Sequence, residues 1–425
     1  MEFRDIKLAN GASLLLVPRK DTEVITLLVY IGTGSRYENS DIAGISHFLE
    51  HLFFNGSKKR PTALDISKEI DGLGASFNAF TGEELTYFYI KAAAEYLDKT
   101  VDILSDMLLN SKFAPEEISK EKKVIKEEIK MYEDMPIELV NDVFGEGIFA
   151  GNGLSRRILG TNKSISALDR NKIINYKNSY YQGKKINICL AGNFGSRSTA
   201  EISRLIEEKF VFPRGVEKEK TSAVFQQKRF NYLARETSQM NLIAGFYAPS
   251  FSDEQRTAAR LLSIILGGNM SSRMFQEIRE KKGLAYFIRT IYHPFSDSGF
   301  IATHAGIAND KAQEALRLIL AEYQKIKDNL TQKEIEKAKN YLIGQIKINL
   351  EDSQEIGYFY LNQLFYLGKM KTPGEYFAEV AEVTKEELAA LAEKYLAAEK
   401  LTVAAIGPKS VKDDIEKIIN SKKER

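Results

Sequence analysis

A pattern of strand, loop and helix occurs twice in this chain of 425 residues. An apolar stretch at 23–31 precedes a loop and a helix around 42–53, and a similar stretch at 240–247 precedes a loop and a helix at 257–266. Each copy is followed by a strand-rich stretch and then an amphipathic helix, at 77–92 and 97–109 in the first and at 284–305 and 310–326 in the second. The repeat predicts an α+β fold of two similar α/β-sandwich domains, each a mostly antiparallel sheet packed with helices.

Length and composition agree with two domains. A chain of 425 residues exceeds what one hydrophobic core supports, and 44% apolar residues give enough material for two cores. Pro, Gly and a run of charges between 212 and 221 indicate a connection. We therefore predict an N-terminal domain at 1–213, a linker at 214–225 and a C-terminal domain at 226–425.

Charge and hydropathy exclude several classes of partner. The net charge is +2, and basic and acidic residues are interspersed, so nucleic acid and anionic membranes are not expected partners. The N-terminus lacks a signal-peptide pattern, and no apolar run approaches a membrane span, so we predict a cytoplasmic protein. Cys189 is the single cysteine and lies in an apolar stretch, where a buried structural thiol is expected.

Two imidazoles and a carboxylate lie within five residues of the first repeat, as His47, Glu50 and His51. On a helix the histidines lie one turn apart and can hold one metal ion, with Glu50 on the same side within reach of a water bound to it. The other side of the helix is an apolar stripe of Ile42, Ile45, Phe48, Leu49, Leu52 and Phe53. This H-x-x-E-H spacing is typical of metallopeptidases and supplies two ligands and a general base.

A hydrolytic zinc site needs a third protein ligand and an open position for water. On a helix from 116 to 134, Glu121 and Glu128 fall on the apolar face, while Glu127 points nearly the opposite way. That face is defined by Ile118, Ile125, Ile129 and Tyr132. Carboxylates on a buried face need a partner, so we predict Glu128 as the third ligand and Glu121 as a carboxylate that orients a histidine.

These residues resemble the insulinase/pitrilysin metallopeptidases, in which H-x-x-E-H is followed well downstream by a glutamate ligand. Here the separation from His51 to Glu128 is 128 − 51 = 77 residues. The segments 32–38, 55–57, 73–81 and 127–136 are also similar to the family, and Arg279 and Tyr286 match a second family motif. The length resembles the short subfamily of mitochondrial processing peptidase subunits and their bacterial homologues. This resemblance leaves an organelle open as the alternative location, if a transit peptide is removed.

The resemblance implies one Zn²⁺ per chain and hydrolysis of short or unfolded peptides, with Glu50 as general base towards a zinc-activated water. Arg279 and Tyr286 would complete the site across a chamber between two protomers, which implies a homodimer. Asn78, Ala79, Phe80 and Thr81 resemble the family's substrate-binding edge strand, although an ordinary buried strand is an alternative. A catalytically silent scaffold or partner-binding subunit is the competing function, and the intact ligands and base argue against it.

Overall fold

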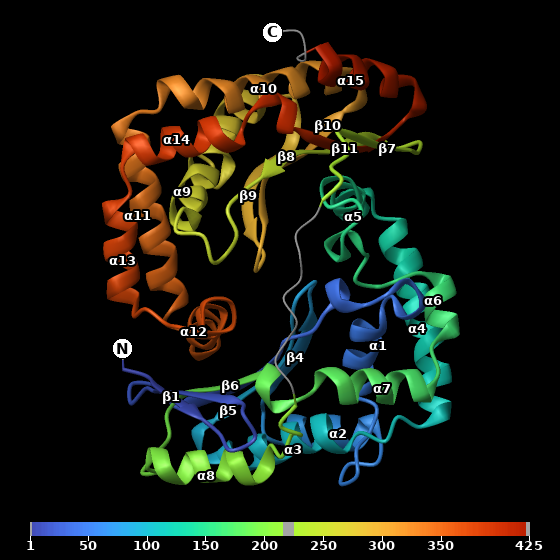
Figure 1. The fold of residues 1–425 in the computed structure, drawn as a ribbon, viewed down its shortest axis with the longest axis vertical. Coiled ribbons are helices and arrows are strands. Elements are labelled where there is room, and N and C mark those ends of the chain that lie inside the picture. The colour runs from blue at the N-terminus through green and yellow to red at the C-terminus, as the bar shows by residue number, and fades with distance from the viewer. Residues whose placement is uncertain (1, 216–224, 422–425) are drawn as a thin grey trace. The chain divides into compact units, whose positions relative to one another are not determined.

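Eleven strands form two separate sheets in the part of the chain that the computed structural model describes, residues 2–215 and 225–421 (Figure 1). The first sheet contains β1 (Arg4–Lys7), β2 (Ser13–Pro18), β3 (Val24–Ile31), β4 (Ser76–Thr81), β5 (Thr86–Ala93) and β6 (Ile186–Gly192). The second contains β7 (Phe230–Ala234), β8 (Gln239–Tyr247), β9 (Ala285–Pro294), β10 (Gly299–Ala308) and β11 (Thr402–Gly407).

The two sheets share one pairing scheme. The first has the order β1-β2-β6-β3-β5-β4, and the second has β7-β11-β8-β10-β9. β2 pairs with β6 in parallel, as β7 does with β11, and the strands that follow are antiparallel in both sheets. The predicted α+β fold of two similar domains with mostly antiparallel sheets is therefore confirmed.

The chain divides into two compact units. One comprises 1–129, 156–220 and 347–373, and the other comprises 130–155, 221–346 and 374–425. Helices of the first unit are α1 (Ile45–Leu52), α2 (Ala63–Gly72), α3 (Leu97–Asn110), most of α4 (Pro115–Glu133), α6 (Asn162–Ala167), α7 (Arg170–Tyr180), α8 (Thr199–Lys209) and α12 (Ser353–Leu367). Helices of the second are α5 (Pro136–Ile148), α9 (Arg256–Gly267), α10 (Ala312–Asn329), most of α11 (Gln332–Asn349), nearly all of α13 (Pro373–Glu382), α14 (Lys385–Tyr395) and α15 (Lys409–Ser421).

Both faces of the first sheet are covered. Leu27 and Val29 of β3 face the core that contains α1, α3 and α8, and Leu28 between them points to the other face. There Gly357 of α12 packs so closely on Leu28 that an added Cβ would lie 2.3 Å from its Cδ1. Figure 1 shows α12 on one side of this sheet and α3 and α8 on the other. β3 is buried along nearly its whole length because helices cover both of its faces.

The second sheet is built in the same way. Its main core joins Leu242 and Ala244 of β8 to α9, α10 and α14. On the opposite face, Val140 and Phe144 of α5 pack against Ile243 of β8 and against β11. Each sheet thus lies between two helical layers.

The helix that covers the face of each sheet opposite its main core comes from the other half of the sequence. α5 precedes residue 213 but packs in the second unit, and α12 follows residue 226 but packs in the first. The predicted domains, 1–213 and 226–425, are each one continuous stretch of sequence. The compact units differ from them, because α5 belongs to the second unit and α12 to the first. Of the expected linker, 214–225, residues 216–224 lie outside the described residues.

Candidate metal centre and active site

The H-x-x-E-H residues lie on α1, whose first turn is held by a carboxylate from outside the helix. Glu38 Oε2 accepts from the N–H of Gly44 at 2.6 Å, and Oε1 accepts from that of Ser46 at 2.8 Å. A negative charge at a helix N-terminus satisfies free N–H groups and favours the helix dipole. The predicted apolar stripe is buried from Ile45 to Phe53, so the helix presents His47, Glu50 and His51 on its remaining face.

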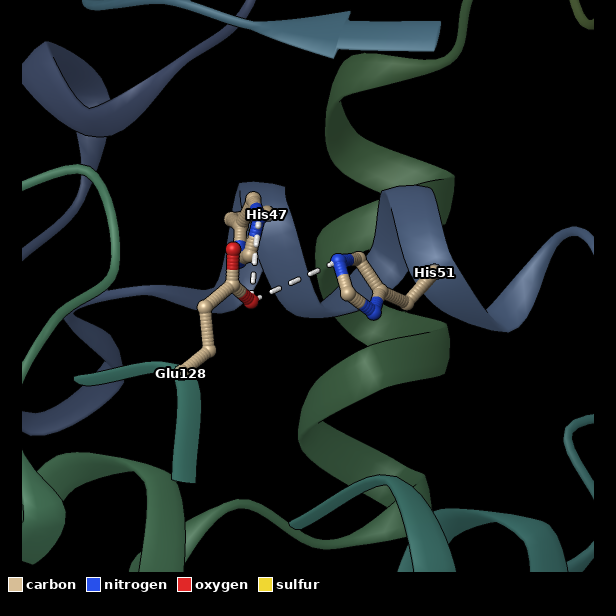
Figure 2. Close-up of side chains that lie close together, drawn as sticks. All are labelled: His47, His51 and Glu128. Carbon is tan, nitrogen blue, oxygen red and sulfur yellow. Dashed lines mark ion pairs between the residues drawn. The ribbon is translucent and has the colours of Figure 1, made fainter. Parts of the chain in front are cut away.

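His47, His51 and Glu128 converge on one point. Glu128 Oε2 lies 3.9 Å from His47 Nε2 and 3.8 Å from His51 Nε2, and the ring centroids of the two histidines are 4.5 Å apart. Figure 2 shows the carboxylate of Glu128, from α4, reaching towards both rings. These are the three residues, among those described, whose ligand atoms cluster as a metal ion requires.

The distances and donor types fit a zinc ion. At 3.8 and 3.9 Å the carboxylate oxygen is too far from the imidazoles for hydrogen bonds. Donor atoms around a tetrahedral zinc ion with bonds of about 2.1 Å lie about 3.4 Å apart, so a small contraction would bring these atoms to ligand spacing. Glu128 Oε2 is buried and has no hydrogen-bond partner within the described parts of the chain. A buried acceptor without a donor is costly unless a cation lies beside it.

The pKa values of His47 and Glu128 also favour a metal ion at this point. Burial, with His51 as a second cause, lowers the pKa of His47 to about 3, so its imidazole is neutral at physiological pH. Burial also raises the pKa of Glu128. A neutral imidazole and a carboxylate that is disfavoured as a lone anion are both suited to bind a divalent cation.

Glu121 contacts His51 on the side of the ring away from Glu128. Its Oε1 lies 2.8 Å from His51 Nδ1, and its Oε2 accepts from Asn55 Nδ2 at 2.8 Å. Burial alone would lower the pKa of His51, but the bond to Glu121 outweighs it and the pKa is raised. This geometry fixes the ring so that Nε2 faces Glu128. The contact between Glu121 and a histidine is the one that the helical phase predicted.

The helical phase of α4 is correct as far as Ile129. Glu121, Ile125 and Ile129 are buried, Glu128 is half-buried and Glu127 is exposed. The inclusion of Tyr132 in the apolar face is wrong, because its side chain is 37% exposed. The first compact unit includes α4 only as far as residue 129, so the core that buries this face does not extend to Tyr132.

Glu50 is held by the strand that was expected to bind substrate. Thr81 Oγ1 donates to Glu50 Oε2 at 2.5 Å. Burial raises the pKa of Glu50, although this hydrogen bond opposes the change. The carboxylate therefore has a fixed orientation on the same helix as the two histidines.

Residues 78–81 lie on β4, which is the edge strand of the first sheet and pairs with β5 alone among the described strands. Asn78 and Phe80 are exposed, Ala79 is half-buried and Thr81 is buried. The strand is therefore not buried along its length, and its binding of substrate stays a prediction. An edge strand with one unpaired side is the structure that strand addition by a peptide requires.

Arg279 and Tyr286 belong to the second compact unit. Arg279 lies in a short π-helix, Phe275–Lys281, with its guanidinium carbon 4.7 Å from the centre of the Phe275 ring. Tyr286 is near the start of β9 and is 75% exposed. Both side chains are accessible, and their part in catalysis stays a prediction.

Three contacts in this site were missed by the sequence reasoning, namely those of Glu38, Asn55 and Thr81. Glu38 lies seven residues before the first residue of α1, Asn55 lies three residues after its last, and Thr81 is on β4. Their positions carry no periodic signal, because each acts through a contact with another element. For Asn55 and Thr81, the carboxylates of Glu121 and Glu50 gave a sign that hydrogen-bond donors are needed, and for Glu38 the free N–H groups at the start of a helix did so.

Two family descriptions match this chain in succession. Residues 14–162 match "Insulinase (Peptidase family M16)", and residues 167–342 match "Peptidase M16 inactive domain". The uncharacterised zinc protease YmxG of Bacillus subtilis is 33% identical over 401 residues, which cover 94% of this chain and 97% of YmxG. The chain belongs to the insulinase family of peptidases. The predicted family, with zinc proteases among its members, is therefore confirmed.

Solved structures of this insulinase-family fold agree. A protease from Helicobacter pylori has a TM-score of 0.87 at 22% identity, covering 96% of this chain and 99% of its own. A chain of complex III2 from Candida albicans has a TM-score of 0.84 at 15% identity, covering 99% of both chains. At these identities the likeness establishes the fold alone. In the part of this chain that the structure describes, no helix is long and apolar enough to cross a membrane.

Proposed function

We propose that this protein is a zinc-dependent endopeptidase that cleaves short or unfolded peptides in extended conformation. The observation that carries the proposal is the convergence of His47, His51 and Glu128, with Glu50 on the same helix as the two histidines. The curated relative YmxG, named a zinc protease, supports the same chemistry. The intact ligand set and base disfavour a silent scaffold subunit, and cytoplasmic location stays a prediction.

The proposed roles follow from the contacts. His47, His51 and Glu128 would hold one Zn²⁺, which would supply Lewis-acid polarisation of the scissile carbonyl and of the attacking water. Glu50 takes a proton from that water at a carboxylate oxygen and delivers it to the leaving amine nitrogen. Its raised pKa favours holding the proton between these two transfers. Glu121 keeps the His51 ring in place throughout.

Substrate binding is assigned to the open edge of β4 and to the second compact unit. A peptide that adds to β4 uses main-chain hydrogen bonds, so its sequence is read only through its side chains. Arg279 and Tyr286 supply a guanidinium and a hydroxyl for the substrate backbone or the oxyanion. We propose that these two groups act in a chamber formed by two protomers.

The general-base assignment is tested with Glu50→Gln, which keeps the side-chain shape and removes the base. The zinc-loaded variant should retain its metal and its folded circular dichroism spectrum while peptide turnover falls about 10²- to 10⁴-fold. Cleavage of a peptide mixture is followed by mass spectrometry, with zinc measured in the same samples. Near wild-type turnover with full zinc would refute the assignment.

The two-protomer chamber is tested by mixing His51→Ala and Tyr286→Phe proteins, each weak alone. Complete exchange of equal amounts makes about half of the dimers mixed, each with one intact chamber, so activity should recover to about a quarter of wild type per protomer. Exchange is checked by mass spectrometry of differently labelled chains. Absence of recovery despite exchange would mean that the site is completed within one chain or that Tyr286 takes no part.

A further inference from the structure

Thr81 lies where the edge strand contacts the proposed base. Its hydroxyl donates to Glu50 Oε2 at 2.5 Å, and the residue is 5% exposed, so water has little access to this bond. Hydrogen bonds to a carboxylate are shorter and stronger than those between neutral groups. Thr81 therefore restricts the rotation of the Glu50 carboxylate.

The backbone of Thr81 faces the open edge of the sheet. The N–H of Gly82 donates to the carbonyl of Leu85 at 2.9 Å, which makes this a hydrogen-bonded pair at the hairpin end. Bonded and non-bonded pairs alternate in an antiparallel ladder, so the next pair, Thr81 with Thr86, is non-bonded. The N–H and carbonyl of Thr81 hence point away from β5, to the side where a further strand would pair.

The same alternation places the backbone groups of Ala79 on the open edge. Its N–H donates to the side-chain oxygen of Asn78 at 2.9 Å, and is thus not used in the ladder with β5. Ala79 and Thr81 consequently direct their backbone groups to the open edge, where an added strand would replace Asn78 as the partner of the Ala79 N–H. Thr81 is the one of the two that also contacts Glu50.

We propose that Thr81 is a positioning residue that links addition of a substrate strand at β4 to the orientation of Glu50. The inference rests on the proposed function, in which a peptide pairs with β4 and Glu50 is the base. A peptide that hydrogen-bonds to the backbone of Thr81 holds this residue in place. The Thr81 hydroxyl in turn holds the carboxylate of Glu50. The base is thereby held in its working orientation when substrate is bound.

The experiment compares Thr81→Val, which keeps the shape and loses the hydroxyl, with Thr81→Ser, which keeps the hydroxyl. Thr86→Val is the matched control, because Thr86 is the buried cross-strand partner of Thr81 and its hydroxyl bonds the carbonyl of Thr33 at 3.0 Å instead. Zinc content and thermal unfolding are measured for each protein. Where the valine variant loses zinc, Thr81→Ala, which adds no bulk, takes its place.

Thr81→Val should lower kcat about 10- to 100-fold and leave KM within about threefold, as expected for loss of a bond to a charged group. Thr81→Ser and Thr86→Val should stay within about threefold of wild type. A fluorescent peptide is also titrated into the zinc-loaded Glu50→Gln protein with and without Thr81→Val. Equal affinities would show that the hydroxyl acts on the base and not on substrate binding.

Several results would overturn the inference. Wild-type kcat in Thr81→Val, an equal loss in Thr81→Ser, or weaker peptide binding that accounts for the whole rate loss would each do so. An inactive Glu50→Gln together with a fully active Thr81→Val would refute this inference alone. A fully active, zinc-loaded Glu50→Gln would refute the proposed function, and this inference with it.

Discussion

Glu121 Oε1 lies 2.8 Å from Nδ1 of His51, on the opposite side of the ring from the nitrogen that faces Glu128. The two carboxylates come from one helix and are seven residues apart, which is nearly two helical turns. A single helix face thus supplies both a proposed ligand and the group that orients another ligand. Replacing different carboxylates of this helix should therefore lower zinc affinity by different amounts.

We expect the loss of zinc affinity to follow the order Glu128→Gln, then Glu121→Gln, then Glu127→Gln. Glu128 is a proposed ligand, and Glu127 is exposed on the far face of the helix. Glu121 contacts a proposed ligand, His51, and loss of such a partner typically lowers metal affinity about 10- to 100-fold. Competition titrations with a chelating dye measure all three. Equal affinities for the Glu121 and Glu127 variants would contradict the orienting role.

Arg60 should be a large contributor to the stability of the first unit. Arg60 is 5% exposed, and its guanidinium contacts Glu69 at 2.5 Å, Asp102 at 3.0 Å and Asp106 at 3.1 Å. Arg60→Ala removes the guanidinium that joins these carboxylates, and the buried Asp106 loses its ion pair, which should cost about 3–5 kcal/mol in the free energy of unfolding.

Arg204 provides the comparison for Arg60. It pairs with Glu208 on an exposed helix surface, with side chains 83% and 58% exposed, so Arg204→Ala should cost no more than about 0.5 kcal/mol. Urea unfolding of the metal-free proteins measures both. Similar losses for Arg60→Ala and Arg204→Ala would show that the buried network contributes little.

Glu334 should make the second unit sensitive to acid. Burial would raise the pKa of its carboxyl, but hydrogen bonds from Arg273 and Thr331 hold it at about 2. A pKa below that of the unfolded chain, about 4.3, stabilises the fold above pH 4.3, and this contribution is lost as the pH falls towards 2.

Unfolding of wild type and Glu334→Gln at several pH values tests this. Wild type should be more stable by about 1–3 kcal/mol at pH 6, and the difference should shrink as the pH falls below about 4.3. Glu399→Gln serves as the control, because Glu399 is exposed at the surface of the same unit. A constant difference between wild type and Glu334→Gln from pH 6 to pH 3 would contradict the role of its charge.

Gly357 should tolerate no larger side chain. An added Cβ would lie 2.3 Å from Leu28 Cδ1 in the packed layer between α12 and the first sheet, so Gly357→Val should destabilise by about 1–3 kcal/mol. Gly344 in α11 has open space around the same position, and Gly344→Ala should stabilise by about 0.5–1 kcal/mol. Thermal unfolding distinguishes the two, and equal effects would argue against close packing of α12.

The sequence predicted those features of the site that depend on local periodicity. One helical turn relates His47 to His51, and nearly two turns relate Glu121 to Glu128, so each pair was placed on one face before any contact was known. The repeat predicted two similar sheets, because the strand and helix patterns that recur in it are also local. Tyr132 shows the limit, since a periodic pattern does not reveal where the core beside it ends.

Contacts between distant segments were decided by the tertiary structure alone. The sequence by itself determined which residues could bind a metal and which faces of α1 and α4 are apolar. Only the fold joined Thr81 to Glu50, 31 residues apart, and sent α5 and α12 to the sheets of the opposite halves. The physical reason is that strands buried on both faces need two helical layers, and the choice of covering helix depends on the packing of the whole chain.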